Sequence, residues 1–175
     1  MYATLRRTAL VLLASVSLGV TPVLVAAPAT ALPSYSTSPV VRWSQPDPHP
    51  TVVNLRYARH AGFDRVVVDL DGKATGYRVR YVDTLRYDGS GDRVPLPGTR
   101  FIEVLLRPAQ AHDDDGRSRY RGPTLKRLWF PSLRGVALTG DFEGVVSFGL
   151  ATDRRAPFRV FRLSQPNRLV IDIAH

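Results

Sequence analysis

The sequence is dominated by short segments in which apolar and polar residues alternate. In residues 51–57, Val53, Leu55 and Tyr57 share one face, and the same period recurs in RVVVDL, YRVRYV, FIEVLL, GVVSFGL, FRVFRL and RLVIDI. A period of two indicates β-strands that are buried on one face. Turn-forming residues separate these segments, at 60–62, 71–72, 88–91, 97–98, 139–141 and 165–167. The sequence therefore predicts an all-β domain, an antiparallel sandwich or barrel.

Helical patterns are nearly absent from the same stretch. Residues 108–112 allow at most one turn of helix. Residues 124–130 allow a short helix, with Thr124 as its N-terminal cap and Pro131 at its end. We expect at most these one or two short helical turns.

One strand pattern occurs twice, as FDRVVVDL at 63–70 and as PNRLVIDI at 166–173. In each copy an Asp faces away from the apolar residue before it, so we expect it on the solvent side of a sheet or paired with an Arg. One interpretation is a structural repeat, in which each of two related sheets contributes one copy to the core. The other is a common amphipathic strand that occurs twice. Neither interpretation implies catalysis.

The first 31 residues have the layout of a secretory signal peptide. Arg6 and Arg7 precede an apolar run over 9–27, and small residues follow at Ala29 and Ala31. We expect export and cleavage after Ala31. The alternative is an uncleaved anchor, because the apolar run is nearly long enough to span a bilayer.

The remaining chain divides into a linker and one domain. Residues 32–50 contain five prolines and four serines, so we expect a disordered linker there. Residues 51–175 are enough for a single domain with its own core. The chain has no cysteine, which excludes disulfides, thiol catalysis and a lipid-modified cysteine.

The chain is strongly basic, with 24 Lys and Arg against 15 Asp and Glu. This balance suits an anionic partner, such as a wall polymer or lipid headgroups, although charge also simply favours solubility. Export makes nucleic acid an unsuitable partner. Four histidines are present without the spacing of a zinc site, so we expect no metal and no cofactor.

Several motifs resemble a known family. The run LSQPNRLVIDI is similar to the closing strand of the AMIN domain, a wall-targeting module of bacterial N-acetylmuramoyl-L-alanine amidases. Residues 51–175 as a whole resemble the AMIN-like domain of small exported actinobacterial proteins, through RHAGFDRVVVDLDG, GYRVRYVD, DGSGDRVPLPG, PAQAHD, GDFEGVVSFGLA and PFRVFRLSQPNRLVIDIAH. The chain has no counterpart of the amidases' zinc-dependent catalytic domain.

The resemblance implies a two-sheet β-sandwich and a non-catalytic binding module at the cell envelope. We expect a secreted, envelope-associated monomer, with no membrane span after cleavage, that binds peptidoglycan or another anionic glycan, or an envelope protein. Two alternatives remain: a small wall hydrolase, and a protein–protein scaffold that docks through an open sheet edge.

Two motifs could supply the groups that a hydrolase needs. In RHAGFD, His60 and Asp64 form an acid–base couple or, with Arg59 and Arg65, only fix a turn. In DFE, Asp141 and Glu143 flank Phe142; we expect Phe142 to point inward and both acids to lie on the rim. The acids then either form a hydrolytic dyad or cap a hairpin.

Arginines on the predicted strands could bind an anionic ligand. Arg78 and Arg80 share one strand face, and Arg159 lies on another strand. Guanidinium groups from two strands can hold carboxylates or phosphates with paired hydrogen bonds. The candidate ligand-binding residues are therefore Arg59, His60, Asp64, Arg65, Arg78, Arg80, Asp141, Glu143 and Arg159. Tyr57, Tyr77, Tyr81 or Tyr120 would stack on sugar rings if they were exposed.

Overall fold

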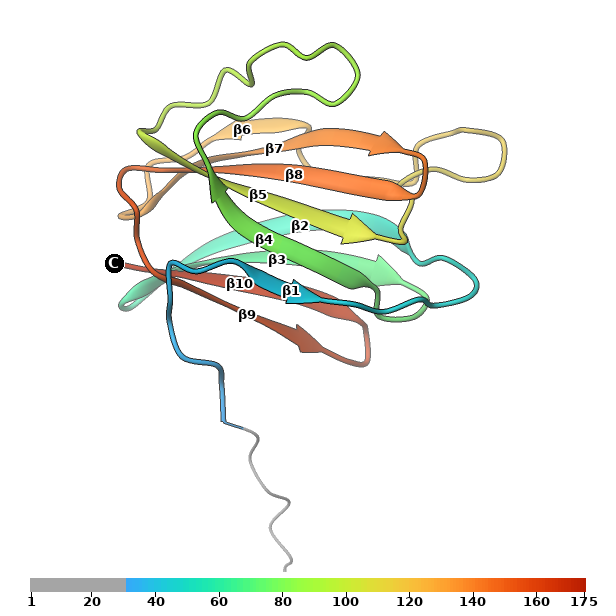
Figure 1. Cartoon of the computed structure of the whole chain (residues 1–175), viewed down its shortest axis with the longest axis horizontal. Helices are drawn as coiled ribbons and strands as arrows, with labels where there is room; N and C mark the ends of the chain where they lie inside the picture. The colour runs from blue at the N-terminus through green and yellow to red at the C-terminus, as the bar shows by residue number, and fades with distance from the viewer. Residues whose placement is uncertain (1–30) are drawn as a thin grey trace, which may run out of the picture. The chain divides into compact units, whose positions relative to one another are not determined.

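The computed structural model describes residues 31–175 as ten β-strands in two antiparallel sheets that face each other (Figure 1). The strands are β1 Val40–Arg42, β2 Thr51–His60, β3 Phe63–Asp71, β4 Gly76–Val82, β5 Arg100–Arg107, β6 Leu125–Arg127, β7 Leu133–Phe142, β8 Val145–Thr152, β9 Phe158–Leu163 and β10 Arg168–Ala174. One sheet has the order β1-β4-β5-β8-β7-β6 and the other β2-β3-β10-β9. The predicted all-β, two-sheet sandwich is confirmed, and no residue of 31–175 is helical.

The core fills the space between the two sheets. Alternate residues of each strand point inward, and many of them are fully buried: Val66, Val68, Ile171 and Ile173 from the four-stranded sheet, and Ile102, Val104, Phe148 and Leu150 from the six-stranded sheet. Burying such a side chain stabilises the fold by about 1.5–3 kcal/mol each. These contacts hold the sandwich together without disulfides.

A second, smaller core lies on the outer face of the six-stranded sheet. The long connection 83–99 places Leu85 and Leu96 there, beside Ala137 and Ala151. Gly149 makes this close approach possible, because a Cβ atom at that position would lie 2.6 Å from the Leu85 side chain. This connection covers one end of the outer face, whereas the end that carries Arg78 is exposed.

Residues 32–50 differ from the disordered linker that we expected. Val40–Arg42 form β1, which pairs antiparallel with β4 at the edge of the six-stranded sheet. Ser36 also exchanges two backbone hydrogen bonds with Phe158 of β9, of 2.9 and 2.8 Å. This segment therefore pairs with the edge strands of both sheets. It is ordered by backbone hydrogen bonds, which a Pro- and Ser-rich composition does not predict.

The repeated strand was predicted correctly, but the interpretation that places its two copies in different sheets was wrong. The two copies, β3 and β10, do not lie in different sheets; they are antiparallel neighbours in the four-stranded sheet. Their register pairs Arg65 with Asp172 and Asp69 with Arg168. An Arg and an Asp four residues apart make the pattern complementary to itself when two copies run antiparallel.

The short helix predicted over 124–130 is also absent, because Leu125–Arg127 pair with β7 instead. Leu125 packs against the second core, which a helical turn would not allow at this sheet edge. The expected signal peptide lies, except for its last residue, outside the described residues. Within 31–175 there is no helix that is long and apolar enough to cross a membrane.

Candidate functional site

The outer face of the four-stranded sheet carries most of the charged side chains of the repeated strand. Because side chains alternate along a strand, Arg65, Val67 and Asp69 of β3 face outward while Val66 and Val68 fill the core. Arg168, Val170 and Asp172 of β10 lie beside them. The face therefore has charged residues at its two ends and valines in the middle.

The first end, which we call the closed end, consists of Arg65, Asp172 and Arg159. Asp172 is fully buried and accepts hydrogen bonds from Arg65 Nε and Nη2, of 2.6 and 2.9 Å, and from Arg159 Nε, of 2.9 Å. Three adjacent strands, β3, β10 and β9, supply these side chains in register. The hydrogen bonds to Asp172 raise the pKa of Arg65 above its usual value, so the guanidinium group of Arg65 stays protonated.

Aromatic rings surround the closed end. The guanidinium of Arg65 lies 5.0 Å from the centre of the Phe63 ring, and that of Arg159 lies 4.6 Å from the centre of the Tyr35 ring. A cation over an aromatic face gains about 0.5–2 kcal/mol. These rings cover the two guanidinium groups and fix their positions.

The second end, which we call the open end, consists of Asp69, Arg56 and Arg168. Asp69 does not pair with its register partner Arg168; it accepts hydrogen bonds of 2.7 and 2.6 Å from Arg56 of β2. Arg168 donates only to the Pro166 carbonyl oxygen, at 3.1 Å, and forms no ion pair with a carboxylate of residues 31–175. The guanidinium of Arg168 is therefore available to a ligand.

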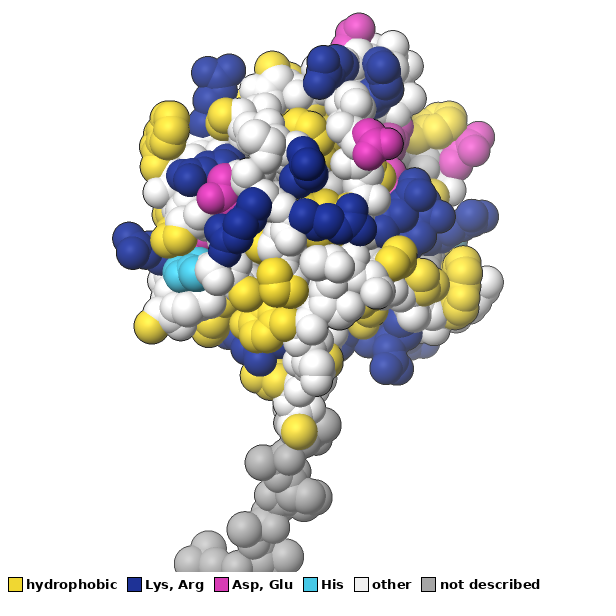
Figure 2. All heavy atoms as spheres, turned by 60° about the vertical axis from the view of Figure 1, so that its left-hand side comes forward, with side chains coloured by type: hydrophobic (Ala, Val, Ile, Leu, Met, Phe, Trp, Pro, Cys, Tyr) yellow, Lys and Arg dark blue, Asp and Glu magenta, His cyan; other side chains and the backbone are white. Residues whose placement is uncertain are grey.

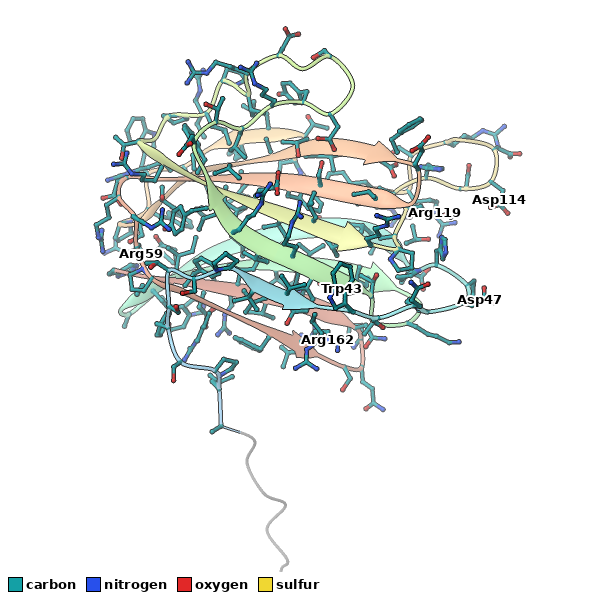
Figure 3. The ribbon with its side chains drawn as sticks, viewed as in Figure 1. Trp43, Asp47, Arg59, Asp114, Arg119 and Arg162 are labelled. Carbon is teal, nitrogen blue, oxygen red and sulfur yellow. The ribbon has the colours of Figure 1, made fainter. Side chains whose placement is uncertain are left out.

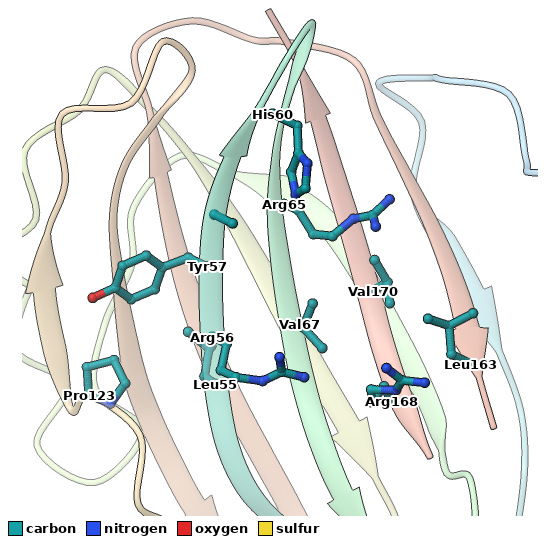
Figure 4. Close-up of a pocket in the computed structure, with 11 residues that line it drawn as sticks. Leu55, Arg56, Tyr57, His60, Arg65, Val67, Pro123, Leu163, Arg168 and Val170 are labelled. Atoms are coloured by element: carbon teal, nitrogen blue, oxygen red, sulfur yellow. The ribbon is translucent and has the colours of Figure 1, made fainter. Parts of the chain in front are cut away.

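A shallow hollow of about 610 Å³ extends over this face (Figure 4). We call it the basic groove; it is lined by Leu55, Arg56, Tyr57, Ala58, His60, Arg65, Val67, Pro123, Leu163, Arg168 and Val170. Valines form its floor, three guanidinium groups and an imidazole surround it, and none of its lining residues is acidic. Arg56 and Arg168 were missing from the sequence-based candidates; the self-complementary spacing pointed to Arg168, whereas Arg56 of β2 lies outside the repeated pattern.

The structure separates the predicted pair of His60 and Asp64. His60 faces outward and stacks on Phe63, with ring centres 4.7 Å apart. Asp64 points the opposite way, is fully buried, and accepts hydrogen bonds from the backbone amides of Ser132, at 2.8 Å, and Leu133, at 2.9 Å. Asp64 therefore fixes the start of β7, while His60 lines the basic groove.

Neither the second carboxylate oxygen of Asp64 nor Arg59 completes an acid–base couple with His60. The second carboxylate oxygen of Asp64 contacts His175 Nε2 at 3.0 Å. Arg59 is exposed and lies at the hairpin end of the sandwich (Figure 3). An acid–base couple of His60 and Asp64 is thus not assembled.

Arg78 and Arg80 lie on the opposite side of the sandwich from Arg65 and Arg159. They project from the outer face of the six-stranded sheet toward Glu103 of β5, at 3.4 Å for Arg78 and 2.9 Å for Arg80. The structure therefore does not bring them together with Arg159 in one clamp.

Asp141 and Glu143 do not form a dyad either. Asp141 contacts His112 Nδ1 at 2.7 Å and accepts a hydrogen bond from the amide of Ala111. Glu143 occupies the hairpin turn with φ of 49°. The prediction that Phe142 points inward was wrong: it is 70% exposed, because a bulge between Leu138 and Gly140 shifts the alternation by one residue.

The four tyrosines proposed as sugar platforms pack toward the core. Tyr77 is buried, and Tyr57, Tyr81 and Tyr120 pack against the main core cluster. Tyr120 donates to the Pro123 carbonyl oxygen at 3.0 Å, and burial raises its pKa well above the usual value. The strongly exposed aromatic residues of the described chain are instead Trp43, Trp129 and Phe142.

No group of three or more His, Cys, Asp or Glu side chains within residues 31–175 is arranged to hold a metal ion. The surface shown in Figure 2 is rich in Lys and Arg side chains, with few acidic ones between them. The face drawn in Figure 2 is therefore predominantly basic.

Comparison with known proteins places most of the chain in one family. Searches of characterised proteins and of solved structures gave no significant match. Among known protein families, the AMIN-like domain matches residues 50–175, which is most of the chain. The chain therefore belongs to the AMIN-like domain family, and this membership suggests a cell-wall-targeting module of the cell envelope.

Proposed function

We propose that this protein is an exported, non-catalytic, monomeric module that binds peptidoglycan or another anionic wall polymer through the basic groove. The observation that carries the proposal is a hollow with Arg56, Arg65, Arg168 and His60 around an apolar floor and no acidic residue in its lining. A carboxylate or phosphate accepts paired hydrogen bonds from a guanidinium group. The valine floor suits the apolar parts of the same polymer.

The arginines of the groove have different roles in this proposal. Arg65 donates two hydrogen bonds to Asp172, so the position of the Arg65 guanidinium group does not depend on a ligand. Arg56 donates two hydrogen bonds to Asp69, so a ligand would share this guanidinium group with Asp69. Arg168 has no described carboxylate partner. Arg168 is therefore the group whose charge a bound anion would neutralise most directly.

The test is retention of the purified full-length protein on protein-free cell walls at low and high salt. We expect retention to fall as salt rises, because exposed charge–charge contacts are screened over about 10 Å at 0.1 M salt. Arg168→Gln removes one charge-assisted contact worth about 1.5 kcal/mol, which weakens binding about tenfold. Arg117→Gln, which removes an exposed arginine of a loop, is the matched control for net charge.

Equal retention of the Arg168→Gln variant and the wild-type protein would overturn the groove as the binding surface. Release of sugars or peptides from the walls would contradict a non-catalytic role. Absence of retention at any salt concentration would instead favour an envelope protein as the partner.

A further inference from the structure

A second exposed feature lies on the other sheet, outside the basic groove. Trp43 follows β1 directly and is 83% exposed. It projects from the edge of the six-stranded sheet, beside β1 and β4 (Figure 3). Two hollows share this indole and the side chain of Arg107.

The backbone that carries Trp43 is held closely. β1 pairs with β4, and a Cβ atom at Gly76 would lie 2.6 Å from the Arg107 carbonyl oxygen and 3.0 Å from the Ser44 nitrogen. Further along, Lys73 Nζ donates to the Asp47 carbonyl oxygen at 2.5 Å. The indole is therefore presented on an ordered support.

The first hollow, of about 150 Å³, is apolar and basic. It is lined by Val41, Trp43, Tyr77, Arg78, Leu105, Arg107 and Val145, without an acidic residue. Arg107 forms no ion pair within residues 31–175, and Arg78 contacts Glu103 only at 3.4 Å. Both guanidinium groups are thus available to an acidic group that rests on this apolar surface.

The second hollow, of about 290 Å³, is polar. It is lined by Trp43, Ser44, Gln45, His49, Arg107, Pro108, Glu143 and Gly144. Its side chains include both hydrogen-bond donors and acceptors. Pockets that enclose a drug-sized ligand measure about 300–1,000 Å³, so each of these hollows suits a single ring better than a large compact molecule.

We propose that this surface, the Trp43 site, binds a pyranose ring that carries a carboxylate. The apolar C–H face of the sugar packs on the indole, which offers a large rigid apolar area. The carboxylate lies between Arg78 and Arg107, and ring hydroxyls exchange hydrogen bonds with Gln45, His49 and Glu143. The site belongs to the other sheet and does not depend on the basic groove.

The experiment uses the full-length Trp129→Phe variant, because the chain has two tryptophans and Trp43 is then its only one. The probes are tetragalacturonate and its methyl ester, in which each carboxylate is replaced by an uncharged methyl ester on the same sugar chain. Tetragalacturonate should change the emission of Trp43 saturably, and the ester should bind at least tenfold more weakly. An unchanged emission, or equal affinity for acid and ester, would overturn the proposal.

Further variants separate this site from the basic groove. By calorimetry, Trp43→Ala should lose at least tenfold in affinity for tetragalacturonate, whereas Trp129→Ala, which removes an equally exposed indole, should not. In the Trp129→Phe background, Arg107→Gln should remove the preference for the acid and Arg168→Gln should leave the Trp43 response intact. The assignment to this site would be overturned if Arg168→Gln abolished the emission change of Trp43 and Arg107→Gln left the preference for the acid unchanged.

Self-association that depends on Trp43 would overturn the proposal in favour of a contact between two copies of the chain; sedimentation measures it directly. Wall retention and the tetragalacturonate titration are independent measurements. A negative result in one measurement therefore does not overturn the proposal that the other measurement tests.

Discussion

The two ends of the β3–β10 pair contain the same residue types, an Arg and an Asp in register, but pair them differently. At the closed end, one buried carboxylate holds two guanidinium groups from the neighbouring strands. At the open end, the corresponding carboxylate, Asp69, is partly exposed and holds an arginine of β2, so that Arg168 has no described carboxylate partner. An identical Arg–Asp spacing thus yields one structural cluster and one cluster with a free cation.

The difference comes from what lies beside each end. The closed end is flanked by β9 and by the rings of Phe63, Phe161 and Tyr35, which exclude water. The open end is flanked by β2, whose Arg56 competes for Asp69. Because the ion pairs of the closed end are buried, losing one of their partners strongly destabilises the fold. The ion pair of the open end is exposed and contributes little to stability, so its arginines can exchange partners with a ligand.

The largest expected effect is on stability, at the closed end. Asp172→Asn should lower the free energy of unfolding by about 3 kcal/mol, because two largely buried guanidinium groups lose their charge partner. Asp69→Asn is the matched substitution at the open end and should cost less than about 1 kcal/mol. Urea denaturation of both variants measures the contrast; equal losses would remove the distinction between the ends.

A smaller effect is expected on wall binding. Asp69→Asn frees Arg56 and removes one negative charge beside the basic groove. Retention on cell walls at low salt should therefore rise several-fold, and the gain should disappear at high salt. A variant with weaker retention than the wild type would show that Asp69 positions Arg56 for binding instead of competing with the ligand.

The smallest effect concerns the ionisation of Tyr35. Burial raises the pKa of Tyr35 above its usual 10.0; Arg159 lowers it and Asp172 raises it. In Asp172→Asn the raising charge is lost while Arg159 stays, so the pKa of Tyr35 should fall. An NMR titration of the tyrosine ring carbon measures this, and an unchanged pKa would mean that the closed end is not intact in solution.

The same shift has a consequence for stability at high pH. The folded protein holds the Tyr35 proton more tightly than the unfolded chain does. The stabilisation from Tyr35 is therefore fully present below the unfolded pKa, near 10, and is lost as the pH rises through the folded pKa. The wild-type protein should become less stable over that range.

The alternation of side chains was enough to predict the fold class but not the pairing of strands. The two-residue period of a strand shows which of its side chains share a face. It does not show which other strand lies next to that strand. One of the two interpretations of the repeat could therefore assign its copies to different sheets. Strand β1 has only three residues in a Pro- and Ser-rich segment, so it produces no periodic pattern.

The candidate site was predicted only in part for similar reasons. His60 and Asp64 are close in sequence, but the two-residue turn pairs His60 with Phe63 and sends Asp64 to the opposite face. The bulge in β7 reverses the expected direction of Phe142. Arg56 and Arg168 become neighbours only through the register of three strands, which the sequence does not state.

The connection 83–99 has a small core of its own, separate from the main one. Contacts that are few and shared with no other cluster can break while the sandwich stays folded. Amide hydrogens of this connection should therefore exchange with solvent as one early cooperative unit, well before those of β3 and β10. The molecule then has a fast-opening flap on one sheet and a slowly exchanging support beneath the groove on the other.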